Sequence, residues 1–421
     1  MSKLARPDQL NLELLPEERL LLAIGKLDPS SSDRALAHEL LRSINLSWDD
    51  TFALAAAHRV HPILAYNLER DPSLKSRVPS EFHRVLRGFR AVAVMRRELY
   101  SRTLAPIVEI LAAQEIRLVL LKGAALIETV YPHGTRLLND FDILIQRCDY
   151  ERVTTAFVEA GFSKRFREGT TEVSELENYH QIGLIKRVGE TMLSVDLHWL
   201  LYPTDRAFCQ IDTPTLMSRS RRIRFGATST FVLSAEDMFV HYASQLVNDE
   251  LSVSYQRMGD FYAMAKSSLS WESTVEIASR AGAAGATHFA LSVSSMLGAN
   301  VPSWAFRELR RACVGCHLSS EYLVVPSLAF RSHAALGAVP ILNSLLYSRQ
   351  RDRIRFLRLF ISARWQSNRR HRGTLRSCLV VVRRIAQASR LSLKLLAAHL
   401  PWWDSAGRAR RLEGQTAGNR L

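Results

Sequence analysis

The chain has 421 residues, of which 47% are hydrophobic and 23% are charged. This balance is typical of proteins that bury ordinary cores, and it excludes a fully disordered or fibrous chain. The formal net charge is +15, but the excess is confined to residues 349–421, which hold 18 Lys or Arg and 3 Asp or Glu. The rest of the chain is electrically balanced, so a general affinity for anions can be expected only of this tail.

The first part of the sequence is predicted to be helical. Pro16 followed by two glutamates, and Ser47 followed by Trp48 and two aspartates, are typical helix starts ahead of apolar residues. We expect helices within residues 8–70 and again over about 81–111.

Short apolar runs replace the helical pattern in the middle of the chain. Such runs are long enough for buried strands and too short for typical helices. We expect strands over 117–122, 141–145, 177–187 and 191–197, and helices over 123–128 and 149–161. Together these segments predict a small mixed sheet with helices packed on it.

Helices return after Ser234, which with Asp237 fits a capping box. Further helices are expected over 271–297 and 303–311. The sequence therefore predicts an α+β protein, with a small mixed-sheet core flanked by N-terminal and C-terminal helical regions. The expected divisions are 1–112, 113–232, 233–348 and a basic, Arg-rich tail over 349–421 that is partly helical and then disordered.

Several features favour a cytoplasmic location. No uninterrupted apolar run reaches the roughly 18 residues that span a bilayer, and the acidic first 18 residues have no apolar signal region. The five cysteines are too scattered for a disulfide framework. The basic tail alternates apolar and cationic groups, so it could lie on an anionic membrane at its inner face, contact nucleic acid with less preference, or be a solvated helical surface.

A pattern of acidic residues is the sharpest chemical signal. Asp140 and Asp142 stand at i and i+2 at the start of an expected strand, so both side chains would project from one face. Two neighbouring carboxylates repel unless they are exposed or share a cation, and a hard divalent ion suits them. Asp196, near the end of another expected strand, could complete a three-carboxylate site.

A possible phosphate site precedes these carboxylates. A strand that turns into a helix at Lys122-Gly123 presents free backbone N–H groups, and a glycine lets a phosphate approach closely. Lys122 and Arg136 add cationic donors, although Lys122 could merely flank the strand and Arg136 could pair with Asp140. A phosphate-binding turn beside a Mg²⁺ ion that is held by carboxylates is an arrangement typical of phosphoryl or nucleotidyl transfer.

Two further features have ordinary structural interpretations. The expected strand fades at Leu197, so His198 is interpreted as a structural histidine rather than a partner of Asp196. Arg257 and Asp260, at i and i+3 on an expected helix, most simply form an ion pair.

Three segments carry a resemblance to a known family. LLKGAAL at 120–126, Tyr-Pro-x-Gly-x-Arg at 131–136 and NDFDILI at 139–145 resemble the uncharacterised nucleotidyltransferase-like proteins of the DNA polymerase beta superfamily. The likeness extends over about 45–305 and includes VDLHW at 195–199. Those bacterial proteins are often associated with polysaccharide gene clusters.

The resemblance implies roles for individual residues. Asp140 and Asp142 would be paired metal ligands, and Asp196 would be a third ligand that could accept the proton of an attacking hydroxyl. Gly123 and Ala124 stand where the superfamily has its glycine turn, and Ala124 offers no hydroxyl to a phosphate.

The leading hypothesis is therefore a Mg²⁺-dependent transferase that moves a nucleoside monophosphate from an NTP to a hydroxyl or phosphate acceptor, in polysaccharide biosynthesis among other settings. The alternative is a catalytically degenerate module that binds a nucleotide or a partner and docks at the membrane through its tail.

Overall fold

The N-terminal part of the protein is a group of helices. The computed structural model describes residues 14–43, 46–167, 169–202, 209, 211–249, 253–313, 316, 346, 347 and 354. Its first helices are α1 (Pro16–Ile24), α2 (Ser31–Leu40), α3 (Trp48–Ala57), α4 (His61–Arg70), α5 (Pro72–Lys75) and the long α6 (Ser80–Ala113). Ser47 caps α3 by accepting a hydrogen bond from the Asp50 N–H, as the sequence predicts. The expectations for the basic tail lie outside the described residues.

A seven-stranded mixed sheet follows. Its strands are β1 (Val119–Leu120), β2 (Phe141–Leu144), β3 (Ser163–Arg165), β4 (Gln181–Val188), β5 (Thr191–His198), β6 (Arg221–Phe225) and β7 (Thr228–Val232). Their order in space is β3-β4-β5-β2-β1-β7-β6. β2 is parallel to β5 and β1 is parallel to β7, while the other neighbours are antiparallel.

Helices also lie between the strands in the sequence. They are α7 (Lys122–Thr129), the short 3₁₀ turn η1 (Arg147–Asp149), α8 (Tyr150–Glu159), α9 (Glu172–Asn178) and α10 (Thr213–Arg219). The strand that the sequence predicts from residue 177 begins only at Gln181, because Thr171 caps α9 over the preceding residues. Asp149 precedes α8 as predicted, but its carboxylate pairs with Arg152 instead of capping the helix.

The last described helices pack together beside the sheet. They are α11 (Ala235–Asn248), α12 (Tyr255–Lys266), α13 (Trp271–Ala281), α14 (Ala284–Met296) and α15 (Ser303–Ala312). Gly282, with a φ of 78°, divides the predicted helix over 271–297 into α13 and α14, since only a left-handed residue fits this turn.

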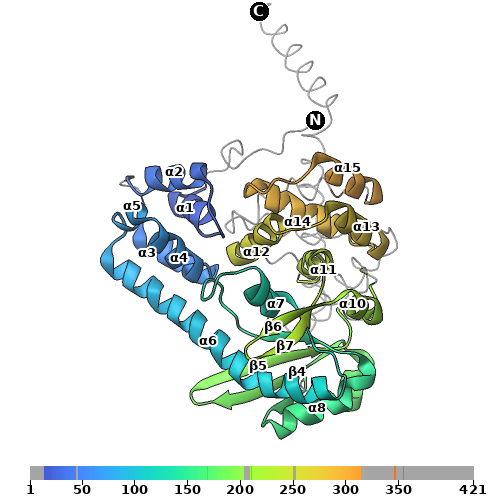
Figure 1. Cartoon of the computed structure of the whole chain (residues 1–421). Helices are drawn as coiled ribbons and strands as arrows, with labels where there is room; N and C mark the ends of the chain where they lie inside the picture. Colours follow the sequence, from blue (N-terminus) through green and yellow to red (C-terminus); the bar gives the residue numbers. More distant parts are fainter. Residues whose placement is uncertain are drawn as a thin grey trace, which may run out of the picture.

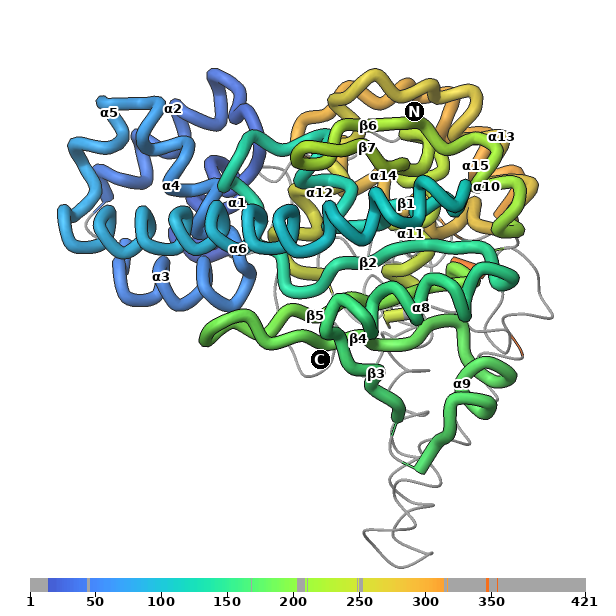
Figure 2. The backbone as a smooth tube through the Cα atoms, turned by 60° about the horizontal axis from the view of Figure 1, so that its bottom comes forward, coloured from blue at the N-terminus to red at the C-terminus, as the bar shows by residue number. Residues whose placement is uncertain are grey.

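The two faces of the sheet have different coverings. Figures 1 and 2 show α6 and α8 across one face, with α11 and the other C-terminal helices on the opposite side. Phe141 of β2 stacks on Tyr100 of α6, with ring centroids 5.2 Å apart. Since side chains alternate along a strand, Asp142 points to the opposite face, toward α7 and the C-terminal helices.

These elements confirm the predicted α+β class, with a small mixed-sheet core flanked by helical regions. One continuous set of buried apolar residues runs from α1 through the sheet to α15. In the described part of the chain, no helix combines the length and apolar character needed to cross a membrane.

Candidate active site

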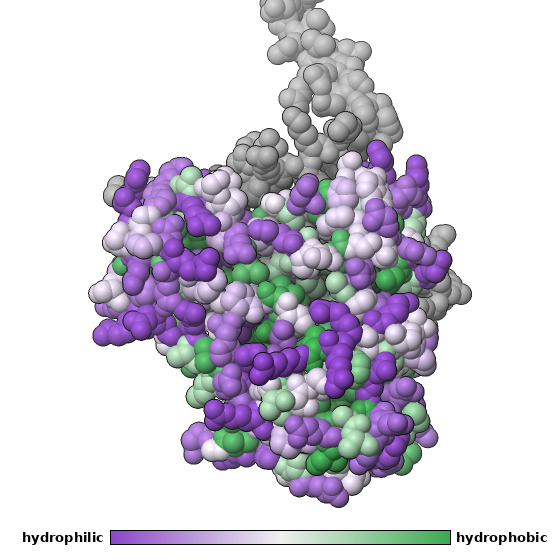
Figure 3. Space-filling view, viewed as in Figure 1, coloured by the Kyte–Doolittle hydropathy of each residue, from purple (hydrophilic) through white to green (hydrophobic). Residues whose placement is uncertain are grey.

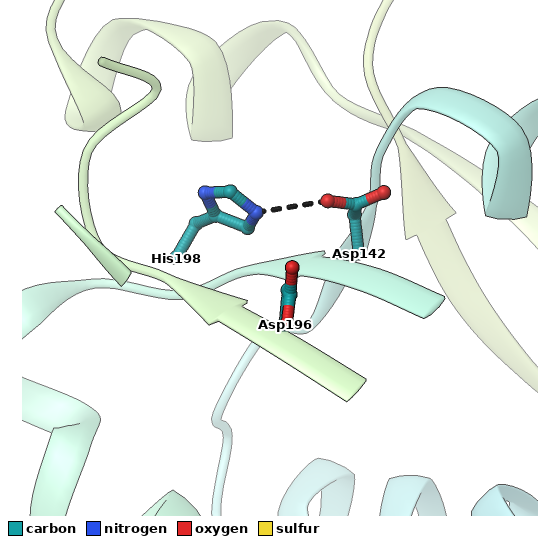
Figure 4. A group of neighbouring side chains, drawn as sticks. All are labelled: Asp142, Asp196 and His198. Carbon is teal, nitrogen blue, oxygen red and sulfur yellow. Dashed lines mark hydrogen bonds and ion pairs between the residues drawn. The ribbon is translucent and has the colours of Figure 1, made fainter. Parts of the chain in front are cut away.

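Two neighbouring parallel strands present polar side chains on one face of the sheet. Asp142 of β2 lies directly opposite Asp196 of β5, and His198 follows Asp196 at i+2. Opposed residues and residues two apart share a face, so all three side chains project together, as Figure 4 shows. Their nearest ligand atoms all lie within 4.8 Å of one another. The fold thus gathers two carboxylates and an imidazole that are distant in the sequence.

Asp142 is buried, and one of its oxygens has two partners. Lys122 Nζ donates to Asp142 Oδ1 over 2.7 Å, and His198 Nε2 lies 3.0 Å from the same oxygen. Burial alone would raise the pKa of Asp142, but the charge of Lys122 and the hydrogen bond from His198 hold it well below its usual value. Burial opposes the charge of Lys122 too, yet Asp142 raises the pKa of this amine. Both groups of the pair are therefore charged.

Asp196 is half-buried and keeps part of its ligand capacity. Its Oδ2 accepts a hydrogen bond from Gln181 Nε2 over 3.0 Å. Within the described residues, Oδ1 of Asp196 and Oδ2 of Asp142 have no hydrogen-bond partner. These oxygens remain available to a ligand on this face of the sheet.

Asp140 lies one residue before β2, with an exposed side chain. Desolvation, and then the charges of Asp142 and Asp196, raise the pKa of its carboxyl group. The three predicted carboxylates therefore influence one another electrostatically. The group within ligand distance, among the described residues, nevertheless comprises Asp142, Asp196 and His198 without Asp140.

The turn into α7 is tightly packed. Lys122 has a φ of 46°, a left-handed conformation that is uncommon for a residue with a side chain. Gly123 and Ala124 are buried behind it. A Cβ on Gly123 would lie only 2.6 Å from Arg136 Nη1, so the glycine admits the guanidinium of Arg136.

Arg136 is held by a carboxylate from a distant helix. Its Nε and Nη2 donate to the two oxygens of Asp260 in α12, each over 2.8 Å, and Asp260 also accepts from Tyr242 Oη. The suggested pairing of Arg136 with Asp140 is therefore wrong. The prediction of an Arg257–Asp260 ion pair is wrong as well, since Arg257 Nη2 pairs with Asp249 Oδ2 over 2.6 Å. A phosphate that bound Arg136 would have to compete with Asp260.

The comparison with protein families gives the chain its class. Residues 45–298, more than half of the chain, match a family model described as uncharacterised nucleotidyltransferase. The chain belongs to this nucleotidyltransferase family. The family resemblance predicted from the sequence is confirmed, and with it the class of enzyme.

Comparisons with individual proteins add a distant similarity. MenT4, a nucleotidyltransferase toxin from Mycobacterium tuberculosis H37Rv, has a solved structure that is similar over 65% of this chain and 97% of its own. The identity is 12% and the TM-score is 0.30. No curated protein matches the chain.

The donor set of this nucleotidyltransferase fits a divalent cation. Carboxylate oxygens suit hard cations, and an imidazole nitrogen extends the range to borderline transition metals. Lys122 balances the charge of Asp142, whereas the charges of Asp140 and Asp196 have no basic partner within ion-pair distance in the described part. Asp142, Asp196 and His198 would hold the cation, with Asp140 beside them.

His198 is the member of this group that sequence reasoning set aside. The sequence pattern ends the strand at Leu197, whereas β5 continues through His198 in pairing with Gln181 of β4. His198 is fully buried, and its Nδ1 has no hydrogen-bond partner among the described residues. The i, i+2 spacing from Asp196 was the available signal.

A separate cavity lies away from these residues. It has a volume of about 460 Å³ and is lined by residues of α7, β7 and α11 and by the C-terminal ends of α10 and α12, including Thr129, Arg219 and Ser234. It shares no lining residue with the carboxylate group. The chemistry of the site is therefore not associated with this cavity.

Proposed function

We propose that this nucleotidyltransferase moves a nucleoside monophosphate from an NTP to a hydroxyl or phosphate acceptor, with Mg²⁺ as the divalent cation. The observation that supports this proposal best is the convergence of Asp142, Asp196 and His198 within 4.8 Å. A bound cation would neutralise charge that develops on the phosphates in the transition state.

The proposed reaction is a substitution at the α-phosphorus of the NTP. An oxygen of the acceptor forms a bond to this phosphorus, and the bond to the bridging oxygen of the β-phosphate breaks. Pyrophosphate leaves with the electron pair of that bond. The proton of an acceptor hydroxyl passes to Asp196, whose Oδ1 has no hydrogen-bond partner among the described residues.

Other residues are proposed to hold the substrate. The backbone N–H groups of Gly123 and Ala124 lie in the first turn of α7, and the N-terminal end of a helix favours a bound anion. The ammonium group of Lys122 would interact with both Asp142 and the triphosphate. Arg136 would support this turn through Gly123, and would reach a phosphate only by releasing Asp260.

The acceptor is proposed by chemical class. A hydroxyl or phosphate of a polysaccharide precursor agrees with the settings in which similar proteins occur, and the scattered cysteines agree with a reaction in the cytoplasm. Docking at an anionic membrane would depend on the tail, which lies outside the described residues.

The proposal is tested with the full chain, Mg²⁺ and each NTP labelled at the α-phosphate, incubated with fractionated acceptors. We expect pyrophosphate release with transfer of label, and a fall of more than about a hundredfold in Asp142→Asn and Asp196→Asn, since loss of a ligand should exceed the usual effect of its supporting contacts. Glu190→Gln is the matched control, because this carboxylate is fully exposed in the turn after β4.

Three results would decide the question. Label transfer that is lost in both aspartate variants and kept in Glu190→Gln supports the enzyme. Equal turnover in all variants contradicts the assigned carboxylates. Nucleotide binding without turnover in every acceptor fraction supports the degenerate module instead.

A further inference from the structure

Two arginines differ from the other basic residues of the described structure. Every other Lys or Arg that is not exposed has a carboxylate or carbonyl partner. Arg59 and Arg96 are half-buried, and neither side chain has an ion pair or hydrogen bond among the described residues. The Nε of Arg96 is buried and has no hydrogen-bond partner in the part of the chain that the structure describes. Burying a charged donor is costly unless a ligand or another group satisfies it.

Arg59 lies in a turn that is fixed against α12. The turn joins α3 to α4, and Arg59 has a left-handed φ of 62°. The ring of the preceding His58 stacks on Tyr255 of α12 at 3.9 Å, and the His58 carbonyl accepts from Gln256 N–H. In Figure 1 the N-terminal end of α4, which follows this turn, faces the centre of the molecule, across from α12. These contacts therefore place the turn that carries Arg59 next to α12, the helix that holds Arg136.

Arg96 lies one helical turn before Tyr100, a residue of α6 that contacts the backbone just before β2 and within β5. The hydroxyl of Tyr100 lies 3.1 Å from the carbonyl oxygens of both Asn139 and Ser194 and can donate its hydrogen to either. Asn139 precedes Asp140, and Ser194 stands two residues before Asp196. Residues four apart share a helix face, so Arg96 lies on the α6 side of the sheet near the N-terminal end of β2, where Asp140 precedes the strand.

The two arginines lie within reach of each other's charge. Burial, and then the charge of Arg136, lower the pKa of Arg59; Asp140 acts in the opposite direction and Arg96 lowers it further. Figure 3 shows apolar residues among hydrophilic ones near the middle of the viewed face, where the N-terminal helices approach α12. Cations beside apolar surface attract an anion more strongly than cations in open water.

We propose that Arg59 and Arg96 form an anion subsite beside the carboxylates, which takes a phosphate group of a substrate. The inference rests on the proposed nucleotidyl transfer, because that reaction brings phosphates to the carboxylates of β2 and β5. Two guanidinium groups can donate several charge-assisted hydrogen bonds to one phosphate. The phosphate belongs either to the triphosphate of the NTP or to the acceptor.

The subsite is tested by calorimetric titration of the full chain with inorganic pyrophosphate in the presence of a chelator. Binding is then independent of the divalent cation and of turnover. We expect Arg59→Gln and Arg96→Gln each to weaken pyrophosphate binding about tenfold, and the double variant to weaken it about a hundredfold. Arg84→Gln/Arg102→Gln, which removes two exposed arginines from α6, is the matched control for general charge effects and for binding by the tail.

Thermal unfolding separates loss of binding from loss of structure. The glutamine variants remove unpaired, mutually repelling charges, so without pyrophosphate we expect them to melt at or above the wild-type temperature. With pyrophosphate, the wild type should gain stability that the double variant does not gain. If the glutamine variants do not fold, Arg59→Lys/Arg96→Lys replaces them; it keeps the charge but loses the forked geometry, and should bind about tenfold more weakly than wild type.

A competition experiment identifies the source of the phosphate. Loss of pyrophosphate binding after saturation with NTP and Ca²⁺ assigns the subsite to the triphosphate, and continued binding assigns it to the acceptor. If the double variant binds pyrophosphate as tightly as the control, the proposal is wrong. That failure is distinct from failure of the proposed function, which is measured by label transfer with Asp142→Asn and Asp196→Asn.

Discussion

Asp142 keeps its charge in a buried position because two donors meet at one of its oxygens. Lys122 supplies a full positive charge, and His198 supplies a hydrogen bond from the neighbouring strand. The second oxygen of Asp142 has no hydrogen-bond partner among the described residues. Such an arrangement orients the carboxylate before any ligand arrives, which lowers the cost of binding a cation.

The imidazole in this group leads to a prediction about metal preference. A nitrogen ligand favours Mn²⁺ over Mg²⁺, so the wild-type protein should bind Mn²⁺ more tightly. We expect His198→Gln to weaken Mn²⁺ binding by roughly 10- to 100-fold and to change Mg²⁺ binding less. Titration of the full chain with each metal, followed by calorimetry, measures both affinities.

The neighbouring His180 provides the control for this prediction. Its ring centroid lies 5.6 Å from that of His198, but it is not in the group within ligand distance. His180→Gln should therefore leave both affinities near wild type. Unchanged Mn²⁺ binding in His198→Gln would mean that this side chain only orients Asp142.

The sequence contains enough information for part of this site. The Asp140–Asp142 spacing, and Asp196 in a second strand, led to the prediction of a carboxylate cluster, and β2 and β5 are neighbours in the sheet. The partner of Arg136 could not be predicted, because Asp260 lies 124 residues further along the chain. Local spacing identifies residues that share a strand or helix face, whereas it does not identify which distant helix packs against that face.

At the scale of elements, the predicted secondary structure is mostly correct in kind and less so at its boundaries. β1 has only two residues because the chain turns into α7 at Lys122, although the apolar run extends further in both directions. The short strands β3 and β6 are rich in basic residues and lack the apolar signature of a buried strand. Pairing with a neighbour defines them, and a single sequence does not reveal that pairing.

The turn into α7 allows a prediction about its glycine. In Gly123→Ala, the new Cβ would lie 2.6 Å from Arg136 Nη1 and 3.2 Å from Leu138 Cδ1. Arg136 cannot move aside easily, because Asp260 binds it through two nitrogens. We expect a loss of about 1–3 kcal/mol in the free energy of unfolding, measured by urea denaturation.

Gly88 is the matched control for this substitution. It lies within α6, and a Cβ there would meet nothing within 4 Å. Gly88→Ala should stabilise the protein by about 0.5–1 kcal/mol, since alanine favours the helix. Equal effects of the two substitutions would show that the contact with Arg136 is not what requires glycine at position 123.

On the scale of the whole molecule, side chains connect the three parts of the described chain. His58 contacts Tyr255 between the N-terminal helices and α12, and Lys26 Nζ donates to the carbonyl oxygen of Leu297 over 2.7 Å. Arg136 and Asp260 join the sheet region to α12. The sequence indicates helical regions on both sides of a small sheet, but these long-range contacts depend on packing that only the folded structure reveals.

The Arg136–Asp260 pair gives a prediction about this connection. Both side chains are buried, so removing either one leaves an isolated charge in the interior. We expect Arg136→Met or Asp260→Leu alone to lower the free energy of unfolding by about 3–5 kcal/mol. The double variant should recover part of this loss, because no unpaired charge remains. Urea denaturation of the four proteins forms a double-mutant cycle, and additive losses would contradict a direct coupling.

The left-handed backbone of Lys122 has a consequence for variation at this position. Glycine would adopt the same twist with less steric conflict, so a Lys122→Gly change should relax the local chain. It would also leave Asp142 without its ammonium neighbour. The backbone conformation therefore favours glycine here, whereas the buried ion pair with Asp142 favours lysine, and the loss of that pair should outweigh the relief of backbone strain.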